Sequence, residues 1–226
     1  MTRSGSTEDG AQRFFDAIAR RYDRTYAPPR DVSREKIAGM LRELPAHARV
    51  LDLGVGTGRE LSALQDAGHE PTGLDLSPEM LAICARRSRP VPLVQADFWK
   101  ALPFADGSFD AVIALHGTLA HPPEDGSYAE LTSELARVLG PDGVLVAEVP
   151  SPAWIEGLER AAAQGDGFRA RRTGPNRCVH EDLVTGVAIE ARVLSVDEWR
   201  ATVAGWSAVR VEAPFDPSEL VIIARR

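Results

Sequence analysis

The stretch VLDLGVGTGRE, residues 50–60, decides the fold of this chain. It starts as a short apolar run typical of a buried strand, turns through three glycines on alternate positions, and passes into a helical pattern. Glycines let the backbone turn sharply and bring its N–H groups close to a ligand at the positive end of the helix. Strand-to-helix turns of this kind bind nucleotide-like ligands at the carboxyl edge of a parallel sheet.

A second apolar run ends in an acidic residue, Asp75. It lies 75 − 54 = 21 residues after Gly54, close to the ~20 expected for a carboxylate that accepts hydrogen bonds from ribose hydroxyls. A strand-end cap on the next helix is the alternative role of Asp75. The glycine turn and this acid together predict a cofactor that carries adenosine.

The glycine spacing indicates which cofactor. A dinucleotide fingerprint would place a third glycine at position 59, which is Arg59. The compact order Gly54-x-Gly56-x-Gly58, preceded by Asp52, resembles motif I of class I S-adenosylmethionine-dependent methyltransferases of the small-molecule type (methyltransferase domain 11/25). The resemblance continues through Asp75, residues 95–98 and residues 108–114, and covers about residues 48–150.

The pattern along the chain predicts an α/β fold, because strands alternate with helices and parallel β-α-β units follow. The resemblance implies a Rossmann-like, doubly wound sheet of seven mostly parallel strands whose last strand is antiparallel. Residues 206–213 and 219–224 are predicted to form an antiparallel pair, since only a short link joins them. Strands are predicted at residues 49–53, 71–75, 91–95, 109–114 and 143–148, and helices at 11–26, 33–44, 58–67, 78–87 and 127–139.

The chain is predicted to hold one domain over residues 11–226, after a disordered N-terminus at residues 1–10. Within it we expect N-terminal lid helices at 11–47, a cofactor-binding core at 48–150, and a C-terminal helix with the antiparallel strands at 195–226. Residues 151–194 have a poor pattern, and such an irregular segment predicts a substrate-covering insert after the fifth strand.

Composition excludes several classes of protein. The net charge of −7 argues against nucleic acid as a partner, and no apolar run is long enough to span a membrane. No signal-peptide core is visible at the N-terminus, which favours a cytoplasmic location. Cys84 and Cys178 predict neither a disulfide framework nor a metal site. The expected partner is a small-molecule substrate, and the sequence leaves the oligomeric state open.

Several residues are cofactor-binding candidates on the strength of the resemblance. It implies that Asp52 holds the amino-acid end of S-adenosylmethionine, that Asp97 accepts from the adenine amino group, and that the backbone of Phe98 meets the ring. Purely structural roles are the alternatives, among them a helix N-cap at Asp97. The remaining candidates are Gly54, Gly56 and Gly58 in the turn, Asp75, the apolar walls Leu76 and Met80, the backbone of Leu115, and the lid tyrosines Tyr22 and Tyr26 within the motif FDAIARRYD at residues 15–23 and just after it.

His116 and His121 are the catalytic candidates, because they follow the fourth strand in the segment that faces the transferred methyl group in this family. Imidazole titrates near neutrality and can deprotonate a hydroxyl or carbon acid. His116 is the first choice as general base, and an ordinary polar loop position is the alternative for each histidine. No stricter signature is expected, since methyl transfer needs alignment and exclusion of water more than covalent catalysis.

Rival functions remain open at this point. A non-catalytic S-adenosylmethionine-binding regulatory module would share every cofactor motif. An NAD-dependent oxidoreductase would need glycine in place of Arg59. An aminopropyl transferase would need acids in residues 115–121, which hold neither Asp nor Glu. An S-adenosylmethionine-dependent methyltransferase acting on a small molecule is the function that the sequence favours.

Overall fold

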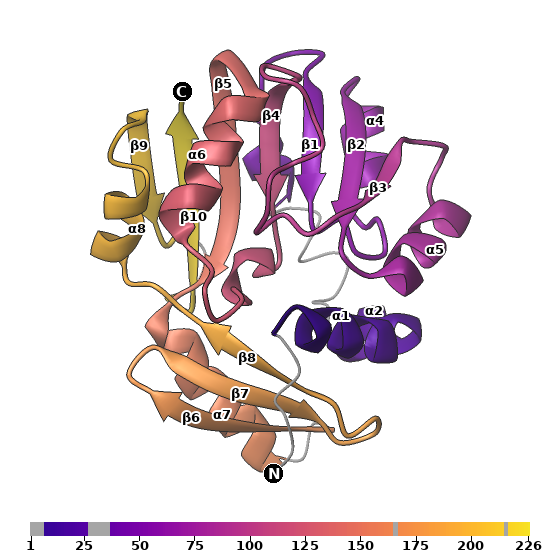
Figure 1. The fold of residues 1–226 in the computed structure, drawn as a ribbon, viewed down its shortest axis with the longest axis vertical. Coiled ribbons are helices and arrows are strands. Elements are labelled where there is room, and N and C mark those ends of the chain that lie inside the picture. Colours follow the sequence, from indigo (N-terminus) through magenta and orange to yellow (C-terminus); the bar gives the residue numbers. More distant parts are fainter. Residues whose placement is uncertain (1–6, 27–36, 165–166, 215–216) are drawn as a thin grey trace.

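A seven-stranded sheet organises the molecule (Figure 1). The structure, a computed structural model, describes residues 7–26, 37–164, 167–214 and 217–226. The strand order is β3-β2-β1-β4-β5-β10-β9; β1 to β5 run parallel to one another, while β10 runs antiparallel to β5 and β9. This arrangement confirms the predicted fold class. The strands are β1 Arg49–Leu53, β2 Glu70–Asp75, β3 Leu93–Gln95, β4 Phe109–Ala114, β5 Leu139–Pro150, β9 Ser207–Glu212 and β10 Glu219–Arg225.

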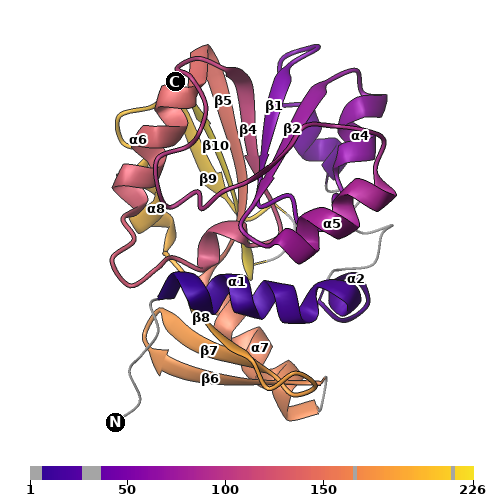
Figure 2. The ribbon, with the colours of Figure 1, turned by 45° about the vertical axis from the view of Figure 1, so that its right-hand side comes forward.

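Helices cover both faces of this sheet (Figure 2). Helices α6 Tyr128–Val138 and α8 Val196–Thr202 pack on one face, with Leu135 and Trp199 in its core. Helix α4 Leu61–Asp66, helix α5 Pro78–Arg87 and the helical residues 37–41 contribute to the core of the other face. Of the helix predicted at 33–44, residues 37–41 are helical in the structure, and residues 33–36 lie outside the described ranges.

Serine side chains cap the N-termini of several helices. Ser77 accepts a hydrogen bond from the Met80 N–H, with Pro78 in the first turn. Ser127 caps α6 in the same way, and Ser195 forms a full capping box with Glu198. These boundaries place the end of β2 and the start of α5 beside the glycine turn.

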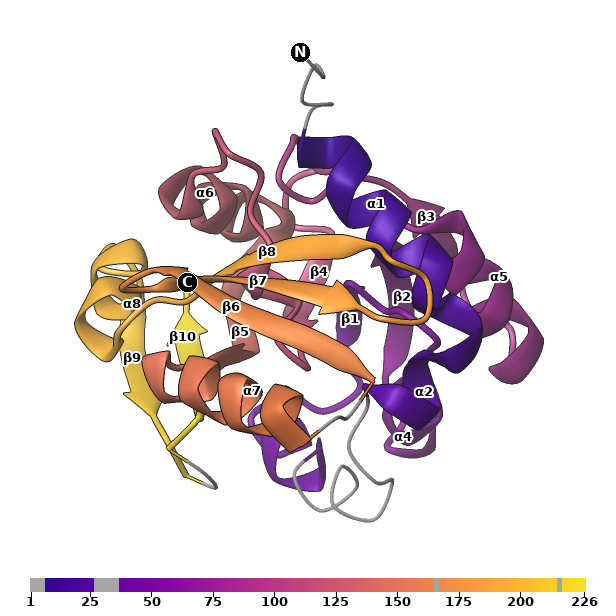
Figure 3. The same ribbon diagram turned by 90° about the horizontal axis from the view of Figure 1, so that it is seen from below.

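The segment between β5 and α8 is ordered secondary structure, which corrects the expectation of an irregular insert. It holds α7 Pro152–Gln164 and a separate three-stranded antiparallel sheet in the order β6-β7-β8 (Figure 3). Its strands are β6 Phe168–Gly174, β7 Arg177–Asp182 and β8 Ala188–Arg192. One face of this sheet meets solvent, so arginines fill the outward positions of β6 and hide the strand pattern.

The N-terminal helices lie across the carboxyl edge of the large sheet, between it and the insert sheet (Figures 1 and 2). They are α1 Thr7–Ile18, the 3-10 turn η1 Ala19–Arg21 and α2 Tyr22–Thr25. Phe14 and Ile18 are buried against Met80 of α5 and Ile189 of β8. Because α1 begins at Thr7, residues 7–10 are helical rather than part of the predicted disordered N-terminus, whose residues 1–6 lie outside the described ranges.

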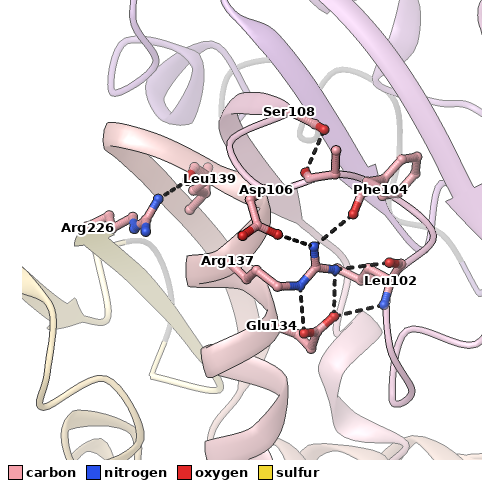
Figure 4. A network of polar contacts seen from close by, with 9 residues as sticks. Leu102, Phe104, Asp106, Ser108, Glu134, Arg137, Leu139 and Arg226 are labelled. Carbon is pink, nitrogen blue, oxygen red and sulfur yellow. Dashed lines mark hydrogen bonds and ion pairs between the residues drawn. The ribbon is translucent and has the colours of Figure 1, made fainter.

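One guanidinium anchors the loop that follows β3 (Figure 4). Arg137 on α6 donates to the carbonyl oxygens of Leu102 and Phe104 at 3.0 and 2.8 Å, and to both carboxylate oxygens of Glu134. Glu134 in turn accepts from the Leu102 N–H at 2.9 Å. These hydrogen bonds to Arg137 and Leu102 lower the pKa of Glu134 to about 2. The anchored loop begins with Asp97 and Phe98, so α6 helps to position part of the site.

Candidate active site

A cavity of about 450 Å³ lies where the order of the parallel strands reverses, between β1 and β4. This is the switch point at which open α/β sheets bind ligands. The large sheet, helix α1 and the insert all contribute to the cavity wall, so segments distant in sequence meet there. The sequence-predicted residues that line it are Tyr22, Tyr26, Gly54, Gly56, Asp75, Leu76, Met80, Asp97, Phe98, His116 and His121.

The glycines of the turn have different roles. Gly54 has φ +72°, and a Cβ there would lie 2.5 Å from Cγ2 of Thr118, the residue that starts the turn η2 Thr118–Ala120 after β4. Gly56 has φ +52° and lines the cavity, and a Cβ there would meet only the Gly54 carbonyl oxygen, at 3.9 Å. Gly58 does not line the cavity. It faces α5 instead, since a Cβ there would lie 2.6 Å from Cys84 Sγ. Its small size serves the packing of the turn against α5.

Asp75 lies at the tip of β2 with both carboxylate oxygens engaged by the backbone. Oδ2 accepts from the Gly56 N–H at 2.8 Å and Oδ1 accepts from the Ser77 N–H at 2.9 Å. Burial raises the pKa of Asp75 to about 6, although these hydrogen bonds act to lower it. A carboxylate has further lone pairs, so Asp75 can also accept from hydroxyls of a ligand in the cavity.

Asp52 is a buried acid whose Oδ2 has no hydrogen-bond partner among the described residues. Burial and the nearby carboxylates of Glu60 and Asp75 raise its pKa well above the ordinary value. Asp52 does not line the cavity in the structure. An acid held this way is stabilised by a positively charged group nearby, which suits the ammonium end of an amino acid.

The far side of the cofactor region is apolar. Leu76, Met80 and Phe98 line it, while Asp97 Oδ1 accepts from the Trp99 N–H at 3.0 Å and so also shapes the turn after β3. The Leu115 side chain is buried in the core of one sheet face instead of lining the cavity, and its carbonyl accepts from Thr118.

His116 forms a buried pair with Glu60, a residue that the sequence reasoning does not single out. Nε2 of His116 donates to Glu60 Oε1 at 2.7 Å. Burial acts to lower the pKa of His116, but the hydrogen bond and charge of Glu60 outweigh it and raise that pKa. His116 also has φ +55°, a conformation that costs energy in a residue with a side chain. The pairing favours the charged imidazolium, which holds its proton.

His121 has the opposite character. Its Nδ1 lies 3.0 Å from the carbonyl oxygen of Glu190 on β8. A carbonyl only accepts, so Nδ1 carries the proton and Nε2 keeps its lone pair in the neutral ring. Burial lowers the pKa of His121, which keeps the imidazole neutral.

Both lid tyrosines line the cavity, and the lid bonds to two different parts of the molecule. Asp23 accepts from the Thr57 hydroxyl in the glycine turn at 2.7 Å and pairs with Arg87 of α5. From the same short segment, Tyr26 and Arg21 both donate to Asp182 of the insert sheet. The helices therefore connect the cofactor turn with the insert.

Sequence reasoning misses most of the wall opposite the cofactor region. The signals there are weak, because each residue belongs to a segment whose partners lie far along the chain. Phe14 and Phe15 look like ordinary apolar helix positions, and the insert residues look like part of a loop. The missed residues include Phe14, Phe15, Trp99, Glu148, Trp154, Leu158, Phe168 and Ile189.

The described residues also bear on the predictions about metals and membranes. Within the described ranges, no cluster of three or more His, Cys, Asp or Glu side chains is arranged to hold a metal ion, and Cys84 and Cys178 are buried free thiols. No helix in that same part of the chain is long and apolar enough to cross a membrane.

Comparison with known proteins agrees with this geometry. Residues 50–143 match the family described as a methyltransferase domain. A demethylmenaquinone methyltransferase of Renibacterium salmoninarum is 31% identical over 218 residues, which cover 89% of this chain and 85% of the relative. One from Beutenbergia cavernae is 38% identical over 148 residues, with 62% and 58% covered. The chain spans only 44% and 55% of the length of two further curated relatives.

Among solved structures, the DhpI–SAM–HEP complex covers all of both chains with a TM-score of 0.72 at 25% identity. The fold and the cavity at the switch point are those of an open α/β protein that binds a nucleotide-like ligand. More specifically, the chain belongs to the class I S-adenosylmethionine-dependent methyltransferases, as the family match and the similarity to the Renibacterium salmoninarum enzyme show.

Proposed function

We propose that this chain transfers a methyl group from S-adenosylmethionine to a small-molecule acceptor. The observation that carries the proposal is the continuous cavity, which joins Gly56 and Asp75 at the cofactor edge to His121 on the opposite side. That the acceptor is a small molecule is inferred from the relatives, two of which are named as demethylmenaquinone methyltransferases. The family membership does not support the nicotinamide alternative, which Arg59 also opposes.

The residues present fit the cofactor. Asp75 would accept from the ribose hydroxyls, and Gly56 would let the backbone approach the ligand without a side chain in the way. The partnerless Oδ2 of Asp52, although outside the cavity lining, would supply negative charge for the ammonium end, and Leu76, Met80 and Phe98 offer apolar contacts for adenine. When bound, the cofactor supplies an electrophilic methyl group on a sulfonium that leaves as a neutral thioether.

The protein itself has to align the acceptor with the methyl group, exclude water from the site and remove a proton from the acceptor. We assign the general base to His121, since its Nε2 has a free lone pair and its ring is neutral. For a hydroxyl acceptor, Nε2 takes the proton as the acceptor oxygen bonds to the methyl carbon. His116 is less suited than the sequence suggests, because Glu60 stabilises its protonated form. We assign His116 to positioning Glu60 beside the glycine turn.

Calorimetry with S-adenosylhomocysteine tests the cofactor site. Asp75→Ala is expected to weaken binding by about 1.5 to 3 kcal/mol, the scale for losing a charged acceptor. Asp110→Ala is the matched control, because this exposed acid pairs with Arg49 at the opposite end of the sheet. Equal affinities in Asp75→Ala and the wild type would remove Asp75 from the site.

A mass-detected screen of small-molecule acceptors then tests turnover. Formation of S-adenosylhomocysteine together with a product heavier by one methylene distinguishes an enzyme from a non-catalytic binding module. With a hydroxyl acceptor in hand, His121→Gln should lower kcat by roughly 10²-fold and leave cofactor affinity unchanged. An unchanged kcat would exclude His121 as the base.

A further inference from the structure

His180, in the middle of β7, occupies an aromatic enclosure on the insert side of the cavity. Its side chain lines the cavity and is 8% exposed. Three rings surround the imidazole, with centroids 4.6 Å away for Phe168, 5.3 Å for Tyr26 and 5.7 Å for Phe14. These rings come from β6, the end of α2 and α1, so the enclosure exists only when the lid and the insert meet.

The imidazole has an unused hydrogen-bonding atom. Nε2 of His180 is buried and has no partner among the described residues. Buried polar atoms are nearly always paired, and an unpaired one costs stability unless something else satisfies it. An atom in this state on a cavity wall is suited to a hydrogen bond with a ligand.

The ring is uncharged at neutral pH. Burial and the proximity of His121 lower its pKa to about 4, against the opposing effect of Asp182. The Asp182 carboxylate is itself engaged by Arg21, Tyr26 and the Thr185 hydroxyl and N–H. His180 therefore offers a neutral donor or acceptor, not an ion pair.

The charged residues that line the cavity further limit the class of acceptor that can bind. Within the described part of the chain, no lysine or arginine lines the cavity, whereas Asp75, Asp97, Glu148 and Glu219 do. The imidazolium of His116, which also lines the cavity, is already paired with Glu60, so an anionic acceptor would meet these carboxylates without a free counter-charge from a lysine or arginine. These acids come from the large sheet and its loops, and Asp182, beside the aromatic enclosure, is already paired with Arg21.

We propose that His180 is the acceptor-recognising residue, which hydrogen-bonds through Nε2 to a hydroxyl of an uncharged aromatic acceptor held among Phe14, Tyr26 and Phe168. The inference rests on the proposed function and specifies its substrate class. His121, on the same cavity, lies just after η2 beside β8 and receives the proton of this hydroxyl, so Nε2 of His180 donates to the hydroxyl oxygen. Stacking against rings supplies the binding energy, and the neutral imidazole selects for the polar group.

Three naphthalene probes that differ only in the polar group test the proposal on the full chain loaded with S-adenosylhomocysteine. We expect 2-naphthol to bind at least tenfold more tightly in calorimetry than 2-naphthoate or 2-naphthylmethylammonium. Equal or tighter binding of the anion or the ammonium, or no binding of 2-naphthol, would overturn the assignment.

Variants at position 180 make the test specific to the imidazole. His180→Phe keeps a ring and should weaken 2-naphthol binding roughly three- to tenfold, the scale for one neutral hydrogen bond. His180→Gln, which retains a polar nitrogen and oxygen at that reach, should stay within about twofold of wild type. Glu181→Gln, next along β7 and paired with Arg169, is the matched control. Wild-type affinity for 2-naphthol in His180→Phe would refute the role of Nε2.

S-adenosylhomocysteine affinity, measured on each variant first, separates the two proposals. Normal affinity shows that a variant is folded and that the cofactor site is intact, so a changed probe preference then concerns His180 alone. Failure of the wild type to bind S-adenosylhomocysteine would instead defeat the proposed function and this inference with it.

Discussion

At the residue scale, two buried acids beside the glycine turn are stabilised in different ways. Asp75 has two backbone N–H groups on its oxygens, whereas Oδ2 of Asp52 has no partner among the described residues. Burial raises the pKa of both, and nearby carboxylates raise that of Asp52 further. Asp75 can therefore ionise without a ligand near neutral pH, while the charge on Asp52 is favoured by a bound cation.

Cofactor affinity should consequently depend on pH through Asp75. The carboxylate is the form that accepts ribose hydroxyls, and its pKa of about 6 means that protonation competes with binding below pH 6. We expect S-adenosylhomocysteine affinity to be level above about pH 7 and to fall by up to roughly tenfold per pH unit below 6. Calorimetry on Asp75→Asn, which cannot titrate, should give weaker binding without this fall; the same fall in that variant would assign it to another group.

The glycines of the turn can be separated by substitution. Gly58→Ala combines φ +77° with a contact of 2.6 Å to Cys84 Sγ, so we expect a loss of about 2 to 4 kcal/mol in unfolding free energy. Gly186→Ala, at φ +70° with no atom within 4 Å, controls for the backbone strain alone and should cost about 1 kcal/mol. Urea unfolding gives both values, and equal losses would contradict a packing role for Gly58.

The sequence predicts these residues unevenly, for physical reasons. Spacing locates a glycine turn and an acid at a strand tip, because local geometry sets both. It does not tell which glycine faces the ligand, since that depends on where Cys84 of α5 packs. Nor does it tell that Glu60 pairs with His116, because the two residues meet only after β1 and β4 are side by side.

At the element scale, the last turns of the lid helices, residues 21–26, make polar contacts on two sides, through Asp23 to the glycine turn and through Arg21 and Tyr26 to the insert. Asp182, whose side chain is fully buried, accepts from Tyr26 and Arg21 of the lid and also caps the turn after β7 through Thr185. Those contacts keep its pKa below the ordinary value in spite of burial. Asp182 thus adds polar contacts between the lid and the insert to the apolar contacts of Phe14 and Ile18 with Ile189.

Removing that charge should release the lid. Asp182→Asn leaves Arg21 without its partner, so we expect a loss of about 1 to 3 kcal/mol in stability and faster hydrogen exchange in residues 19–26. Glu181→Gln lies one position away, pairs with Arg169 near the surface, and should change stability by no more than about 0.5 kcal/mol. Unaltered exchange in the lid of Asp182→Asn would show that other contacts hold it.

The elements of the core agree well with sequence reasoning, and those of the insert do not. Strands β1, β2 and β4 are largely buried along their length because helices cover both faces of the sheet. The strands of the insert sheet mix buried and exposed positions, and outward arginines such as Arg169 and Arg171 give β6 the pattern of a basic loop. Turn-forming residues at 165–167 and 174–175 add to that pattern.

At the scale of the whole molecule, the site is assembled from three parts that each contribute one wall. The large sheet supplies the cofactor edge, the N-terminal helices the cover, and the insert sheet the wall opposite (Figures 1 and 3). A ligand that fills the cavity would contact all three parts, and binding to the folded chain alone would add to its stability.

S-adenosylhomocysteine should accordingly raise Tm. At a concentration 100 times Kd the added stability is about 2.7 kcal/mol, which for a domain of this size corresponds to roughly 5 to 10 °C. Differential scanning fluorimetry provides the measurement, with NADH as the control nucleotide that should leave Tm unchanged. A comparable rise with NADH would revive the nicotinamide interpretation of the glycine turn.

The insert sheet and α7 form one uninterrupted stretch of chain between the end of β5 and the start of α8. The glycine turn, Asp75 and Glu60 all precede that stretch. Exchanging it for the corresponding segment of another methyltransferase should therefore change acceptor specificity and leave S-adenosylmethionine binding intact. Because Phe14 and Ile18 of α1 pack against Ile189 of β8, any replacement segment would also have to fit that helix.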